Sequence, residues 1–113
     1  MNATRFNQVL ADQIEKINEI LGSKAGEYAD DNDRLHNFKA SASLQGITPM
    51  EALRGKMAKH TISIYDMIGS GQTFPLEKWD EKITDHINYL ILLRALVVEW
   101  DDEDAKLGTG STD

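Results

Sequence analysis

The chain has no cysteine among its 113 residues, which excludes a disulfide framework and any thiolate metal site. It also has little proline and few aromatic residues. The first six residues lack the basic and apolar regions of a secretory signal, and Arg94 interrupts the longest apolar stretch. We therefore expect a cytoplasmic protein with no membrane span.

Basic residues are also scarce, since 12 lysines and arginines face 19 acids and give a net charge of −7. Residues 99–113 hold six of the acids and one base, so they carry −5 of this total. The remainder is close to neutral and shows no basic patch of the size that duplex nucleic acid requires. We expect no duplex-binding function, although a local cluster of cations could still hold a small anion.

What the chain does contain is helical periodicity. Apolar residues recur every three or four positions over 4–21, with Thr4 as the predicted N-cap and Gly22 as the predicted end. Further helices are predicted over 34–44, 49–68 and 75–102. The third begins with the clearest signal, a Thr48-Pro49-Met50-Glu51 capping box. We predict an all-α, four-helix bundle-like single domain over 1–104 and a flexible polar tail over 105–113.

The last predicted helix is apolar almost all round from Ile83 to Trp100, yet Glu81, Asp85 and Asn88 share one stripe. Carboxylates among apolar side chains are costly unless they are paired or bind a cation. The stripe is therefore either a structural ion-pair seam or the wall of a site. One short chain cannot readily bury such a helix, so we expect a homo-oligomer with contacts through Ile91, Leu92, Val97, Val98 and Trp100.

Two further polar clusters have helical spacing. Arg34, Asn37 and Phe38 can share a face, where they would hold a phosphate or stack on a base, or simply flank a core phenylalanine. Lys56, Lys59 and His60 lie on the capped helix, where the lysines would meet phosphates or form a solvated face. Each cluster alone leaves both interpretations open.

Taken together, several segments resemble the nucleotide modification-associated domain family, small helical proteins frequent in bacteriophage genomes. The segments are Gly26-Glu27-Tyr28-Ala29, Arg34-Leu35-His36-Asn37-Phe38-Lys39, Lys59-His60 and Asp80-Glu81-Lys82-Ile83-Thr84-Asp85-His86-Ile87-Asn88-Tyr89. The resemblance implies a nucleotide or nucleotide-derived ligand more firmly than it implies a reaction.

A more distant likeness is to the MazG-type all-α nucleotide pyrophosphohydrolases, which hold Mg²⁺ with acidic residues around a triphosphate. This likeness implies Mg²⁺ at Glu27, Glu81 and Asp85. The chain departs from that pattern at Lys82, where a carboxylate would stand three residues before Asp85. Two functions stay open: Mg²⁺-assisted hydrolysis of a nucleotide, and sequestration of a nucleotide immune signal by a non-catalytic phage sponge.

The resulting candidate site lies between the Glu27–Phe38 region and the facing sides of the last two helices. Lys24, Arg34, Lys39 and Lys59 are the candidate phosphate contacts, and Asn37, Asn88 and Tyr89 are the candidate base or ribose contacts. Tyr28, Phe38 and His60 complete the predicted nucleotide-binding set. A purely structural helical module, in which these polar stripes are ion pairs, is the third interpretation.

Overall fold

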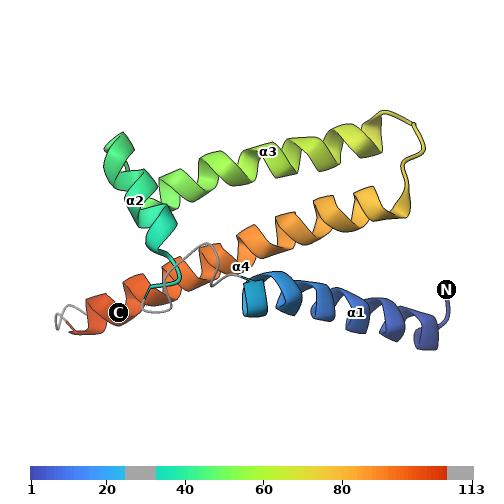
Figure 1. Cartoon of the computed structure of the whole chain (residues 1–113), viewed down its shortest axis with the longest axis horizontal. Helices are drawn as coiled ribbons and strands as arrows, with labels where there is room; N and C mark the ends of the chain where they lie inside the picture. The colour runs from blue at the N-terminus through green and yellow to red at the C-terminus, as the bar shows by residue number, and fades with distance from the viewer. Residues whose placement is uncertain (25–32, 107–113) are drawn as a thin grey trace, which may run out of the picture.

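The protein is described by a computed structural model that covers residues 1–24 and 33–106, and every element in those ranges is a helix. The elements are α1 (Ala3–Ile17), the π-helical segment η1 (Asn18–Lys24), α2 (His36–Gln45), α3 (Pro49–Gly69) and α4 (Leu76–Lys106). Figure 1 shows α3 and α4 as an antiparallel pair, with α2 across one end and α1 beside the first half of α4. The all-α prediction is confirmed.

The predicted start of α3 is confirmed in detail. The Thr48 Oγ1 accepts a hydrogen bond from the Glu51 backbone N–H at 3.1 Å, and a Glu51 carboxylate oxygen accepts one from the Thr48 N–H at 3.0 Å. Both hydrogen bonds satisfy N–H groups that have no partner within the helix. At the preceding turn, Gly46 ends α2 with φ of +68°, a conformation that favours glycine.

The predicted bounds of the first helix are wrong at both ends. Asn2, not Thr4, is the N-cap, and its Oδ1 accepts from the Arg5 N–H at 2.8 Å. Asparagine is at least as good a cap as threonine, so the earlier residue takes this role. The helix also does not end at Gly22, because η1 continues through that residue to Lys24. At the other end of the chain, α4 runs to Lys106, past the predicted boundary at 104, and the rest of the predicted tail lies outside the described residues.

The core lies where α2 crosses α3 and α4. Leu35, Phe38, Leu53 and Leu96 form one buried cluster, and Leu53 is completely inaccessible to solvent. Tyr89, Leu92 and Leu93 pack against this cluster from α4. This end of the molecule therefore holds the positions at which a change in side-chain volume would be felt most.

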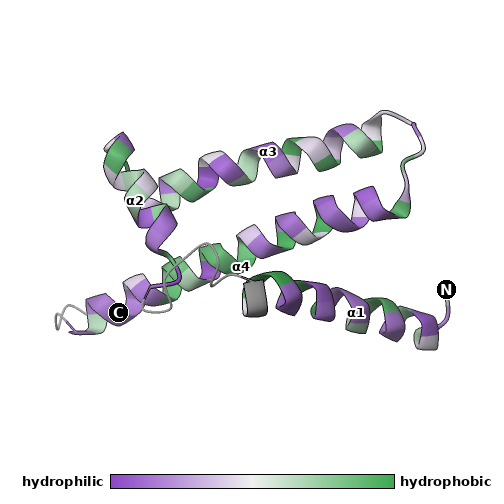
Figure 2. Cartoon of the chain, in the orientation of Figure 1, coloured by the Kyte–Doolittle hydropathy of each residue, from purple (hydrophilic) through white to green (hydrophobic). Residues whose placement is uncertain are grey.

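Fewer residues are buried at a distance from that core. Figure 2 shows hydrophobic residues distributed along α1 and α4, but α1 has no buried residue. Its contact with α4 includes a hydrogen bond of 3.0 Å from the Gln13 amide to the Thr84 hydroxyl. On α4, only Thr84, Asn88 and Leu96 are buried, so, as its apolar character led us to expect, one chain does not enclose this helix. In the described ranges, no helix combines the length and apolar character needed to cross a membrane.

Candidate functional site

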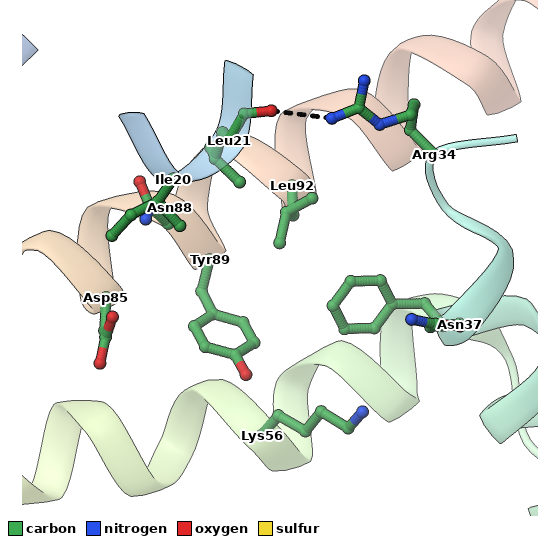
Figure 3. Close-up of a pocket in the computed structure, with 10 residues that line it drawn as sticks. Ile20, Leu21, Arg34, Asn37, Lys56, Asp85, Asn88, Tyr89 and Leu92 are labelled. Atoms are coloured by element: carbon green, nitrogen blue, oxygen red, sulfur yellow. Dashed lines mark hydrogen bonds between the residues drawn. The ribbon is translucent and has the colours of Figure 1, made fainter. Parts of the chain in front are cut away.

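A pocket of about 280 Å³ lies where η1, α2, α3 and α4 approach one another (Figure 3). The chain segment at Arg34 and the first turn of α2 form one side, and residues 85–92 of α4 form the other. The π-helical turns of η1 contribute two apolar side chains, and π-helical turns often occur at functional sites. The lining residues are Ile20, Leu21, Arg34, Asn37, Phe38, Lys56, Asp85, Asn88, Tyr89 and Leu92.

Aromatic side chains occupy the middle of the pocket. Phe38 and Tyr89 meet edge to face, with ring centroids 6.4 Å apart and planes at 76°. His60 packs against Tyr89, with centroids 4.8 Å apart. Burial raises the pKa of the Tyr89 hydroxyl, and the charge of Asp85 raises it further. Tyr89 is therefore a neutral, hydrogen-bonding aromatic side chain at physiological pH.

Two cations flank the pocket from opposite sides (Figure 3). The Arg34 guanidinium donates a hydrogen bond of 2.8 Å to the Leu21 carbonyl, which ties the start of α2 to η1. The Lys56 ammonium lies 5.2 Å from the centre of the Phe38 ring, in cation–π contact. Arg34 and Lys56 are both exposed, so an incoming anion can reach them.

A carboxylate and an amide lie beyond Tyr89, one turn apart on α4 (Figure 3). Burial raises the pKa of Asp85 above 3.8, although the nearby charge of His60 acts in the opposite direction. Asn88 is only 5% exposed, and its Oδ1 has no hydrogen-bond partner among residues 1–24 and 33–106. An unpartnered buried acceptor costs roughly 1–3 kcal/mol, so a donor that reached this atom would remove that cost.

The structure brings six of the predicted site residues together in this one pocket. Five of them belong to the predicted nucleotide-binding set and one, Asp85, to the predicted metal set. They are Arg34, Asn37, Phe38, Asp85, Asn88 and Tyr89. They come from two segments about fifty residues apart in sequence.

Other predicted residues lie elsewhere. Lys39 forms ion pairs with Asp33 at 2.9 Å and with Glu99 at 2.8 Å, and both acids raise its pKa. Lys59 is exposed and does not line the pocket, and His60 lies behind Tyr89 rather than in the lining.

The predictions that involve residues 24–28 cannot be compared with the structure in the same way. Lys24 ends η1, and no contact of its side chain is described. Glu27 and Tyr28 lie outside the described residues.

Four lining residues were absent from the predicted site. Lys56 was weighed as a phosphate contact, but the prediction took Lys59 instead. The spacing of Lys56 could have identified it as a lining residue. Lys56 lies four residues before His60, so both share one face of the helix, and His60 contacts Tyr89. The other three, Ile20, Leu21 and Leu92, are apolar side chains, and their periodicity does not distinguish a pocket wall from a core.

Two of the three predicted Mg²⁺ ligands, Glu81 and Asp85, line neighbouring cavities. Asp85 lines the main pocket and also, with Glu81, a second cavity of about 240 Å³ beside Lys16. Across the described ranges, no three histidine or acidic side chains are grouped closely enough to hold a metal ion. The third predicted ligand, Glu27, is not in those ranges, so this finding does not test the full predicted set.

Comparisons of the chain with protein-family models, with curated proteins and with solved structures gave no match. The function must therefore be argued from the pocket and from the residues that line it.

Proposed function

We propose that the pocket binds a nucleotide or a nucleotide-derived small molecule. The observation that carries this proposal is the arrangement of three kinds of group along one pocket. Arg34 and Lys56 flank the pocket from opposite sides, aromatic rings lie between them, and Asp85 and Asn88 lie beyond Tyr89. A nucleotide has matching groups, since its phosphate is anionic and its base is flat and bears hydrogen-bonding groups.

The chemistry of the side chains supports this assignment. An arginine can bind phosphate oxygens through two parallel N–H groups, and a lysine adds a compact positive charge. Tyr89 and Phe38 offer aromatic surface to a base, and stacking contacts of this kind do not require a particular base. A ligand donor bound to the Asn88 Oδ1 would also remove the cost of leaving that atom buried without a partner.

Two versions of this function differ in chemistry. In the first, Mg²⁺ held by Glu27, Glu81 and Asp85 would polarise phosphate oxygens for attack by water. In the second, the protein sequesters a nucleotide signal used in host defence, as a phage sponge in the host cytoplasm. A turnover assay with Mg²⁺ and nucleoside triphosphates separates them, since only the first version releases pyrophosphate or phosphate.

Self-association is part of the proposal. The apolar stripe of α1 includes Phe6, Leu10 and Ile14, which are each about half exposed, and a lone helix of this length is marginal in water. On α4, Ile91, Val97, Val98 and Trp100 are also exposed, whereas Leu92, predicted with them, lines the pocket. A second copy of the chain would cover such surfaces, which a stable monomer rarely leaves open.

The binding proposal is tested by two measurements. Mass spectrometry of small molecules released from the purified protein identifies the ligand class. Calorimetry with nucleoside monophosphates then compares wild type with Arg34→Ala, Lys56→Ala and the control Lys59→Ala. The control removes the same charge from the same helix as Lys56→Ala, but outside the pocket lining.

We expect Arg34→Ala and Lys56→Ala each to weaken binding about tenfold or more at low salt, and less at high salt, because salt screens the charges. Lys59→Ala should leave affinity within about twofold of wild type. Equal losses in all three variants would assign the effect to net charge and would contradict the pocket as the site.

A further inference from the structure

The acidic end of the pocket presents hydrogen-bond acceptors. Asp85 and Asn88 are three residues apart on α4, so their side chains lie on one face of the helix. An ionised carboxylate only accepts hydrogen bonds, and the Asn88 Oδ1 is an acceptor with no partner in the described part of the chain. A ligand that engages both groups must therefore bring a donor to each of them.

The common bases differ in this respect. Guanine carries two neighbouring donors on its pairing edge, the ring N1–H and the exocyclic N2 amine. On adenine and cytosine the corresponding edge places one amine beside a ring-nitrogen acceptor, and on uracil and thymine one N–H lies between two carbonyl oxygens. If an acceptor of the ligand faced Asp85 or Asn88, neither the ligand atom nor the protein atom would have a donor. This is costly in a partly desolvated site.

Resting on the nucleotide-binding function above, we propose that the ligand is a guanine nucleotide whose N1–H and N2 amine donate to Asp85 and Asn88. Its phosphate then lies on the far side of Tyr89 from Asp85, between the two sides of the pocket that Arg34 and Lys56 flank, and the sugar lies against the aromatic rings (Figure 3). The volume of about 280 Å³ is near the lower limit of small-molecule pockets, which favours one base and one sugar.

The burial of Asp85 agrees with this role. Desolvation is the main reason that its pKa is raised in the ligand-free protein, and Glu81 raises it further, while His60 and Lys82 lower it. Two N–H donors from a base would stabilise the charged carboxylate and lower that pKa again. This role differs from that of a Mg²⁺ ligand, because base recognition by Asp85 needs no metal ion.

The deciding experiment is calorimetry of the wild-type full chain with three monophosphates in the presence of EDTA. The ligands are GMP, IMP and AMP, and IMP differs from GMP only in lacking the N2 amine. We expect GMP to bind at least about tenfold more tightly than IMP, because loss of the amine leaves one buried acceptor without a donor. AMP should bind more weakly than GMP by a similar or larger factor.

The possible results separate failure of the guanine assignment from failure of the nucleotide-binding function. Equal affinities for the three ligands would overturn the guanine assignment and leave the nucleotide-binding function standing. Tighter binding of AMP would do the same. Failure of all three to bind, with or without Mg²⁺, would contradict both. If GMP binds only with Mg²⁺ and this requirement disappears in Asp85→Asn, Asp85 is a metal ligand and the guanine assignment is wrong.

Two variants test whether Asp85 is responsible for the preference for GMP over AMP. Asp85→Asn should lower the ratio of GMP to AMP affinity at least about tenfold, since the new amide can turn a donor toward adenine. Glu77→Gln is the matched control, because it removes the same charge from an exposed side chain of α4 that does not line the main pocket. The control should keep the wild-type ratio. If Asp85→Asn fails to fold, the comparison of ligands on the wild-type protein still decides the proposal.

Discussion

The two ends of this molecule are stabilised in different ways. Where α2 crosses α3 and α4, Leu53 and its neighbours are buried in a shared cluster, and the candidate pocket opens beside it. Along α1, a helix with a strong apolar stripe has no buried residue at all. A good amphipathic sequence is thus enough to predict a helix, but it does not guarantee that the same chain covers its apolar side.

Removing volume at the packed end should have the largest effect. Leu53→Ala should destabilise the protein by about 2–5 kcal/mol, because a fully buried leucine leaves a cavity when it is truncated. Urea denaturation measures this loss. Leu44→Ala is the control, since that leucine is 90% exposed and its truncation should change stability by less than about 0.5 kcal/mol. Similar losses in both variants would contradict the assignment of Leu53 to the core.

The exposed stripe of α1 should matter for association rather than for the stability of one chain. Leu10→Asp places a charge in the middle of the stripe and should weaken self-association by more than about tenfold, or about 1.4 kcal/mol. Sedimentation across a concentration series measures this change. Gln8→Asp is the control, because Gln8 is exposed and lies two residues from Leu10, so it adds the same charge on the opposite side of the helix. A wild-type protein that stays monomeric at micromolar concentration would contradict self-association.

Removing either of the two helix caps should have a smaller effect on stability, and the effect should differ between the two helices. Thr48 and Asn2 both accept a hydrogen bond from the backbone N–H three residues later. Thr48→Ala should lower global stability by about 1 kcal/mol, since α3 is part of the core. Asn2→Ala should instead fray α1 and leave the denaturation midpoint nearly unchanged. Hydrogen exchange resolves the two responses, and a global loss in Asn2→Ala would show that α1 is coupled to the core.

The smallest effect on stability is expected in the pocket. Because burial raises the folded-state pKa of Asp85, its ionised form costs stability at neutral pH. That cost is absent below the unfolded value near 3.8 and develops as pH rises through the folded pKa. Asp85→Asn should therefore be slightly more stable than wild type at pH 7, with the difference vanishing near pH 3.

Thermal melts of Asp85→Asn and Glu81→Gln at both pH values test this prediction. The Glu81→Gln control should not reproduce the pH-dependent gain, because that carboxylate is exposed. If Asp85→Asn unfolds the protein while the remaining folded fraction binds nucleotides normally, Asp85 serves the fold rather than a ligand.

Much of the fold could be predicted because its signals are local. The capping box at Thr48 and the left-handed glycine after α2 each act within a few residues, so they appear in the sequence as short patterns. The first helix was harder, since Asn2 and Thr4 are both competent caps and π-helical turns have no comparable local signature. Predicted helix boundaries are therefore least accurate where two neighbouring positions can end the helix at nearly equal free energy.

The sequence also predicted part of the candidate site. Arg34, Asn37 and Phe38 share one spacing and Asp85, Asn88 and Tyr89 share another, so each group could be found along its own segment. The choice between neighbouring lysines could not be made in this way. Lys56 and Lys59 have the same charge on the same helix, and only the position of Phe38 on α2 makes Lys56 the one at the pocket.

The sequence by itself determined that this chain is helical, where most helices begin and end, and which polar residues fall on one face of a helix. Those properties follow from backbone hydrogen bonding and side-chain periodicity within a single segment. The tertiary structure alone decided that Lys39 pairs with Asp33 and Glu99, that the buried Asn88 Oδ1 has no partner in the described part of the chain, and that α1 keeps its apolar stripe exposed. Each of these depends on which surfaces of different helices meet, and that is settled by packing between segments distant in sequence.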